Sequence, residues 1–210
     1  MNGKKEICIG CIGDSITAGT GLANPAIEAF PARLQELLGE NVKVFNFGNG
    51  GKTMRSDLGV DSYVNSSSYE SLMQNAKDLD VVTVMLGTND AYHAKGWTEY
   101  ESSTFKKDCR ALFTALCEQS PSAVFVLMNS PECFGEKAAR YDMIPLRALQ
   151  ANLADELKRD GFTTYFFDMH SVTAPLGEHF PDKLHPNATA HMTMAKALAE
   201  LIFKMINDIS

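Results

Sequence analysis

Residues 6–19 read EICIGCIGDSITAG, an apolar run that ends in a Gly-Asp-Ser turn. A short run with three isoleucines is typical of a buried strand, and the Gly-Asp pair that follows it favours a tight turn. The turn brings the carboxyl group of Asp14 next to the hydroxyl of Ser15. That hydroxyl either caps a helix or serves as a nucleophile, and a nucleophile needs a base and oxyanion donors from elsewhere in the chain.

Short apolar runs alternate with amphipathic segments along the whole chain. After the run at residues 6–12, further apolar runs follow at residues 42–47, 80–86, 123–129 and 163–167. Segments with apolar residues at helical spacing cover residues 28–38, 104–117, 145–158 and 187–207. Runs that are apolar throughout indicate strands buried on both faces, as in a parallel sheet. The alternation predicts an α/β fold, a three-layer α/β/α sandwich.

The composition is that of an ordinary globular protein. The chain has 210 residues, of which 45% are hydrophobic and 21% are charged, and its net charge is −7. This length fits a single domain over residues 1–210. The acidic balance argues against nucleic acid as a partner, and no apolar run reaches the ~20 residues of a membrane span. The apolar run near the N-terminus is too short for a signal peptide, so we expect a cytoplasmic protein.

The five cysteines do not suggest a metal or disulfide site. Cys8 and Cys11 are three residues apart on a predicted strand and therefore point to opposite faces. Cys109, Cys117 and Cys133 are scattered, and no second pair completes a tetrahedral set of ligands. We expect small buried thiols, no metal and no cofactor, which suits a reducing compartment.

Four polar segments lie where strands end or where the last helix begins. They are Gly13-Asp14-Ser15, FGNGGKT at residues 47–53, LGTNDA at residues 86–91 and DKLHPNATAH at residues 182–191. In a parallel sheet, the loops at the carboxyl ends of the strands share one edge. Taken singly, each segment has a structural interpretation as well, since Asn89 and Asp90 fit a helix cap, the glycines fit a turn and His185 fits a surface position.

Together, the four segments contain the groups that serine catalysis needs. Asp182 and His185 are three residues apart, so one turn lets the carboxylate orient the imidazole that would activate Ser15. An oxyanion needs N–H donors, and these fit the backbone of Ser15, a glycine after the second strand and the side chain of Asn89.

The four segments resemble the blocks of the SGNH (GDSL-type) hydrolase family, in the same order. The resemblance implies that Ser15 is the nucleophile, that Asp182 and His185 complete the triad, and that Gly51 and Asn89 join Ser15 in the oxyanion hole. It also implies a flavodoxin-like five-stranded parallel sheet of order 2-1-3-4-5 and ester hydrolysis without a metal. Residues 30–54, FPARLQELLGENVKVFNFGNGGKTM, are similar to a branch of carbohydrate and sialate O-acetylesterases. Ala190 stands where relatives usually have glycine, and this difference does not affect the catalytic groups.

Two other interpretations stay open at this point. GGKT at residues 50–53 is similar to the end of a phosphate-binding loop, but Asn46 occupies the position of that motif's first glycine. A flavodoxin-like binding module without catalysis is the second, and it leaves the Asp182–His185 pair unexplained.

The sequence says less about the substrate. We expect a small-molecule ester, with a short acyl group such as acetyl on a sugar or similar alcohol; a lysophospholipase or thioesterase is the alternative. Side chains that could contact the substrate are Met54, Tyr92, His93 and Phe134, and Trp97 and Tyr141 are further candidates to border the pocket; packing on helix ends is their structural alternative. We interpret His170, His179 and His191 as structural or surface residues, and the oligomeric state is not readable.

Overall fold

The computed structural model describes residues 6–94 and 96–209 and contains one parallel sheet. The strands are β1 (Ile7–Gly13), β2 (Val42–Gly48), β3 (Val81–Met85), β4 (Val124–Met128) and β5 (Thr164–Phe167). All pairings are parallel and the order is β2-β1-β3-β4-β5, as predicted. The apolar runs found in the sequence therefore correspond to the strands to within about one residue at each end.

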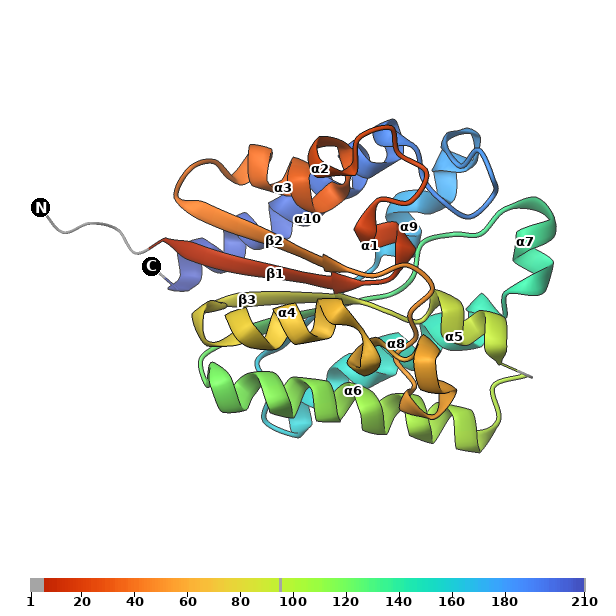
Figure 1. Cartoon of the computed structure of the whole chain (residues 1–210), viewed down its shortest axis with the longest axis horizontal. Coiled ribbons are helices and arrows are strands. Elements are labelled where there is room, and N and C mark those ends of the chain that lie inside the picture. Colours follow the sequence, from red (N-terminus) through yellow and green to blue (C-terminus); the bar gives the residue numbers. More distant parts are fainter. Residues whose placement is uncertain (1–5, 95, 210) are drawn as a thin grey trace, which may run out of the picture.

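Helices cover both faces of the sheet (Figure 1), which confirms the three-layer sandwich. On one face lie α2 (Pro25–Glu28), α3 (Phe30–Leu38), α9 (Met169–Thr173) and α10 (Ala188–Ile209). On the other lie α4 (Ser67–Asn75), α6 (Glu99–Gln119) and α8 (Met143–Arg159). Each face buries its own apolar cluster, and the strands contribute alternate side chains to the two.

The cysteines follow this alternation. Cys11 packs in the cluster under α3 and α10, whereas Cys8 packs against the cluster on the opposite face, as predicted. All five thiols are free. Burial raises the pKa of Cys11, Cys109 and Cys133 to about 12, so these three thiols are poor nucleophiles at neutral pH.

The short elements lie mainly in the connections around the carboxyl edge of the sheet. The α-helical ones are α1 (Ser15–Ala18), α5 (Thr88–His93) and α7 (Gly135–Arg140). The 3₁₀ turns are η1 (Ser56–Asp61), η2 (Tyr63–Asn65), η3 (Ala76–Asp78) and η4 (Ala174–His179). Residues 64–71 include the start of α4, where the Ser66 hydroxyl accepts the N–H of Tyr69 as an N-cap.

The strand order fixes where a ligand site can form. The chain runs from β1 to β2 on one side and then returns past β1 to β3 on the other, so β1 and β3 flank the point where the order reverses. Connections diverge there and leave a crevice at the carboxyl ends of the strands. Ser15 follows β1 and Asn89 follows β3, so both belong to this crevice. Within the described part of the chain, no helix combines the length and apolarity that crossing a bilayer requires.

Candidate active site

Ser15 is the first residue of α1, directly after the central strand β1. The preceding Asp14 is buried, and its carboxylate accepts the Ile16 N–H at 2.9 Å, which makes it the N-cap of α1. Burial raises the pKa of Asp14 to about 6. A Cβ on Gly48 of the neighbouring strand would lie 2.3 Å from the Ala18 nitrogen, so only glycine lets β2 approach this turn. The turn that carries Ser15 is thus fixed by the Asp14 cap and by close packing against Gly48.

Ser15, His185 and Asp182 form one chain of hydrogen bonds. The Ser15 Oγ lies 3.0 Å from His185 Nε2, and His185 Nδ1 lies 2.7 Å from Asp182 Oδ2. Because the carboxylate can only accept, Nδ1 carries the proton and Nε2 is free to accept the serine hydroxyl. Ser15 and His185 lie 170 positions apart in the sequence, and together with Asp182 they have the geometry that serine catalysis requires of a nucleophile, a base and an orienting acid.

The turn at Asp182 makes this geometry possible. Its Oδ1 accepts the backbone N–H groups of Leu184 at 3.0 Å and His185 at 2.7 Å, so the carboxylate holds both the backbone and the ring of His185. Lys183 takes a positive φ of 69° inside this turn. Burial opposes ionisation of Asp182, but the hydrogen bonds from His185 and Leu184 outweigh it and lower the pKa to about 2. The acid is therefore charged throughout the neutral range.

Gly51 lies in the loop after β2 and Asn89 lies in the first turn of α5, and a hydrogen bond joins these two segments. The Asn89 Nδ2 donates to the Lys52 carbonyl at 2.9 Å, and Lys52 follows Gly51 directly. Gly51 has φ of +75°, a conformation that favours glycine. A Cβ on the adjacent Gly50 would lie 3.8 Å from the Ser15 Cβ, so this loop runs beside the serine.

Asp90 holds the loop after β2 in place through two hydrogen bonds to its backbone. Its side chain is fully buried, and its carboxylate accepts the backbone N–H groups of Met54 at 2.8 Å and Arg55 at 3.0 Å. Burial raises the pKa of Asp90 to about 7, while the two backbone donors and Arg55 favour the charged form. The sequence suggested a helix cap for Asn89 and Asp90, which is wrong: the N-cap of α5 is Gly87, and Asp90 lies inside the helix and reaches across to the loop.

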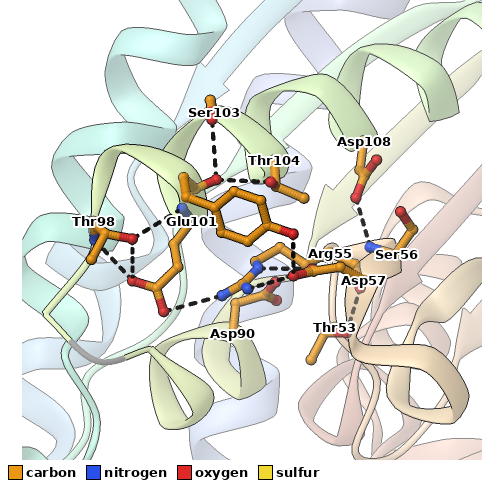
Figure 2. A network of polar contacts seen from close by, with 11 residues as sticks. Thr53, Arg55, Ser56, Asp57, Asp90, Thr98, Glu101, Ser103, Thr104 and Asp108 are labelled. Atoms are coloured by element: carbon orange, nitrogen blue, oxygen red, sulfur yellow. Dashed lines mark hydrogen bonds and ion pairs between the residues drawn. The ribbon is translucent and has the colours of Figure 1, made fainter.

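Arg55 fastens the same loop to α6, as Figure 2 shows. Its guanidinium binds both oxygens of Asp57, at 3.1 and 2.8 Å, and contacts Glu101 at 3.4 Å. Asp108 accepts the N–H of Ser56 at 2.6 Å. The side chains of Arg55 and Glu101 are only 5% and 9% exposed, so their ion pair is largely shielded from water and salt, whereas Asp57 is 27% exposed. Sequence reasoning missed this network, because its members come from segments far apart in the chain.

Several side chains expected at the pocket border lie in the core instead. Met54 is 3% exposed, and Trp97 and Tyr141 are each 9% exposed, within the apolar cluster under α6 and α8. Their apolar surface is used in packing, which leaves the Met54 side chain little surface for a substrate to contact. The Phe134 ring packs on Phe180 at 4.9 Å. Tyr92 remains 38% exposed, which keeps it accessible at the rim.

The other histidines have partners of their own. His93 is exposed and lies 3.8 Å from Asp61. His191 is fully buried, where its Nδ1 accepts the Phe30 N–H at 3.1 Å, and burial lowers its pKa to about 4. His170 binds Glu132 at 2.6 Å, and His179 is 3.6 Å from Glu178. The ring of His185 alone lies between Ser15 and an orienting carboxylate among the described residues.

The geometry of residues 50–53 does not fit a phosphate-binding loop. The Lys52 ammonium donates to the Val60 carbonyl at 2.6 Å. Thr53 forms an isolated bridge with Ser62, whereas the motif requires a helix at this point. The loop therefore lacks the free lysine and the helix N-terminus that would hold a phosphate.

The chain is similar to known proteins in both sequence and structure. The model of the GDSL-like Lipase/Acylhydrolase family matches residues 11–192, which include Ser15 and His185. An acetylxylan esterase of Xylanibacter ruminicola is 28% identical over 215 residues, covering 95% of this chain and 44% of that protein. This chain thus spans about half the length of that relative.

Solved structures show the same fold. A candidate arylesterase from Agrobacterium tumefaciens str. C58 is 27% identical with a TM-score of 0.72, over 94% of this chain and 99% of that one. A carbohydrate acetylesterase family member from Sinorhizobium meliloti is 21% identical with a TM-score of 0.71, over 96% and 99% of the two chains. At that identity the second likeness supports the fold alone.

Proposed function

The chain belongs to the GDSL-like lipase/acylhydrolase family, and we propose that it hydrolyses short-chain carboxylic esters through an acyl-enzyme on Ser15. One observation carries the proposal: the Ser15 hydroxyl, both nitrogens of His185 and the Asp182 carboxylate are joined at 3.0 and 2.7 Å. Ser15 follows β1 at the switch point of the sheet, where ligands bind in this class of fold. This position supports a catalytic role for Ser15.

In the proposed reaction, His185 Nε2 takes the Ser15 proton as Oγ forms a bond to the ester carbonyl carbon. Asp182 stabilises the imidazolium that results. The tetrahedral intermediate collapses as its bond to the alcohol oxygen breaks, and His185 returns the proton to that oxygen. Water then attacks the acyl-enzyme with His185 again as base, and the acid and free Ser15 are released.

The oxyanion of both tetrahedral intermediates needs donors opposite His185. We assign this role to the backbone N–H groups of Ser15 and Gly51 and to the side-chain amide of Asn89. The Asn89–Lys52 hydrogen bond supports the assignment, because it uses one N–H of the amide and fixes the direction of the other. Donors fixed before the reaction need no reorganisation as the charge develops.

We further propose that the substrate is an O-acetylated carbohydrate. The support is the similarity to an acetylxylan esterase over 95% of this chain. The burial of Met54, Trp97 and Tyr141 also leaves few large apolar side chains at the rim for a long acyl chain. Tyr92 and His93, both exposed at the end of α5, remain candidates for substrate contacts.

The test is covalent labelling combined with turnover. A fluorophosphonate probe should modify wild-type protein at Ser15 and should fail on Ser15→Ala, and this variant should lose hydrolysis of p-nitrophenyl acetate while its circular dichroism stays unchanged. Ser103→Ala, at an exposed position of α6, is the matched control and should behave as wild type. Turnover of the ester by folded Ser15→Ala would refute the nucleophile.

A further inference from the structure

A second hollow lies at the same end of the sheet as the candidate active site. It is a cavity of about 390 Å³ between the loop after β4, the start of α8 and α9. Its polar wall consists of Glu132, Arg147 and His170, and Tyr141 and Ile144 contribute apolar surface. Small-molecule sites of proteins commonly have ~300–1,000 Å³ and combine apolar walls with a few convergent polar groups. Neither the triad nor the oxyanion hole uses this cavity.

Backbone hydrogen bonds connect both flanks of the cavity to the candidate active site. On one side, the N–H of Asp142 donates to the carbonyl of Ala91 at 3.3 Å, and Ala91 lies two residues after Asn89. On the other side, the N–H of Phe134 donates to the carbonyl of Lys183 at 2.9 Å, inside the turn that carries His185. In Figure 1, α5, α7 and α9 gather at this end of the molecule.

The polar wall is preorganised. Glu132 accepts Arg147 Nη2 at 3.0 Å with one oxygen and contacts His170 Nε2 at 2.6 Å with the other. Burial opposes ionisation of Glu132, but the hydrogen bonds from Arg147 and His170 outweigh it and lower its pKa. The side chains are 24, 13 and 30% exposed for Glu132, Arg147 and His170, so a ligand can reach their edges without breaking the ion pair.

The charges of the wall select against anionic ligands. Among the described residues that line the cavity, Arg147 alone carries a permanent positive charge, and Glu132 already neutralises it. Asp142 adds a second carboxyl group. A phosphate, sulfate or uronate would therefore meet no uncompensated cation. A neutral ligand with several hydroxyl groups suits this wall better, since hydroxyls donate to carboxylates and accept from guanidinium and imidazole N–H groups.

We propose that this cavity is a carbohydrate subsite that binds a neutral sugar ring in the alcohol portion of the ester. This rests on the proposed function, because His185 returns its proton to the alcohol, which must therefore lie on the side of the His185 turn. Glu132, Arg147 and His170 bind hydroxyl groups there. Ile144, which is 80% exposed, covers the apolar face of the ring.

The binding step can be measured without catalysis. Trp97 is the only tryptophan of the chain, and its Nε1–H donates to the carbonyl of Asp142, a cavity residue, at 2.8 Å. Its fluorescence therefore reports on this wall. Titration with xylotriose, which carries no ester, should give a saturable change in wild-type emission. A linear response, with no saturation, would refute the subsite even if the protein is an active esterase.

Filling the cavity from an exposed position tests its location. Ala138 lines the cavity from α7 and is exposed, so Ala138→Phe adds bulk without removing any packed side chain. Its neighbour Ala139 is also exposed but does not line the cavity, so Ala139→Phe is the matched control. We expect Ala138→Phe to weaken xylotriose binding at least tenfold and Ala139→Phe to leave it within twofold. Equal affinities of the two variants would refute this position of the site.

Kinetics then link the cavity to the reaction. For Ala138→Phe and for His170→Ala, the ratio of kcat/KM on acetylated xylotriose to that on p-nitrophenyl acetate should fall about tenfold, through KM. Arg110→Ala, which breaks a comparable ion pair with Glu156 between α6 and α8, should keep the wild-type ratio. An unchanged ratio in both cavity variants would refute the subsite. Failure of the wild type on both esters would instead refute the proposed function, whereas failure on the sugar ester alone would refute the carbohydrate substrate and this subsite together.

Discussion

The side-chain amide of Asn89 in α5 and the backbone carbonyl of Lys52 in the loop after β2 are joined by a hydrogen bond of 2.9 Å. An amide has two N–H groups, and this bond occupies one of them. The second is then held in a fixed direction. Because Lys52 follows Gly51, the same bond also positions the backbone of the loop that carries the proposed oxyanion glycine.

We expect Asn89→Ala to lower kcat on p-nitrophenyl acetate by roughly 10²-fold with little change in KM, the usual loss for one oxyanion donor. Asn65→Ala is the matched control, because Asn65 also donates to a loop carbonyl, that of Gly59 at 2.8 Å, but is exposed and outside the crevice. A rise in KM at constant kcat would show that Asn89 binds the ground state, and the assigned role would be wrong.

Asp90→Asn should lower kcat about tenfold, because an amide oxygen can replace only one of the two carboxylate oxygens that hold the N–H groups of Met54 and Arg55. Losing a hydrogen bond to a charged group costs ~1.5–3 kcal/mol, and part of this cost should appear as disorder of the oxyanion loop. Asp57→Asn breaks the ion pair of the Arg55 side chain but leaves both backbone bonds intact, so it should retain most of the activity. An equal loss of kcat in the two variants would show that Asp90 acts through the overall stability of the fold and not by holding the oxyanion loop.

The sheet and the Asp182–His185 pair could be predicted from the sequence because both depend on local signals, whereas Ser15 was grouped with the pair because loops at the carboxyl ends of parallel strands share one edge. Five uninterrupted apolar runs can hardly be anything but buried strands, and a three-residue spacing brings a carboxylate to a histidine within one turn. The burial of the Met54 side chain could not be predicted from local signals. An apolar side chain next to a glycine-rich loop can face solvent or the core, and only the packing of α6 decides it.

The supporting groups were missed for a different reason. Asp90 looked like a cap because aspartate after a strand usually is one, and its real partners lie 35 and 36 residues earlier in the chain. Glu132, Arg147 and His170 likewise come from three separate segments. A single sequence has no signal for contacts of this kind, because no periodicity links them.

The stability of the fold should fall in acid partly through Asp182. Its pKa is lowered from 3.8 to about 2 in the folded state, so the unfolded chain binds more protons between these values. Stabilisation by Asp182 is therefore complete above about pH 4 and is lost as the pH falls through about 2. Urea unfolding at about pH 5 and about pH 2.5 should show a smaller loss of unfolding free energy for Asp182→Asn than for wild type. An equal loss would mean that the Asp182–His185 pair does not form in solution.

Chelation should leave esterase activity intact. The proposed chemistry draws its nucleophile, base and oxyanion donors from the chain itself, and Asp182 and His185 are bound to each other. Among the residues that the structure describes, no three His, Cys, Asp or Glu side chains are grouped as metal ligands. Activity after incubation with EDTA and desalting should match that of untreated enzyme. A loss that added zinc or another divalent ion restores would overturn the metal-free mechanism.

Acyl-chain length tests the shape of the site, and acetyl and propionyl esters should be the best p-nitrophenyl substrates. In a roomy apolar channel each added methylene would gain up to ~0.8 kcal/mol of burial, so kcat/KM would climb with length. Such a channel needs apolar side chains facing the crevice, yet Met54, Trp97 and Tyr141 are at most 9% exposed and packed in the core. The added carbons of an octanoate would therefore stay in water or clash with the loop at Gly50, and kcat/KM should fall from acetate to octanoate. A steady rise over that series would show that the crevice opens into an apolar channel, and would favour a lysophospholipase or thioesterase over an acetylesterase.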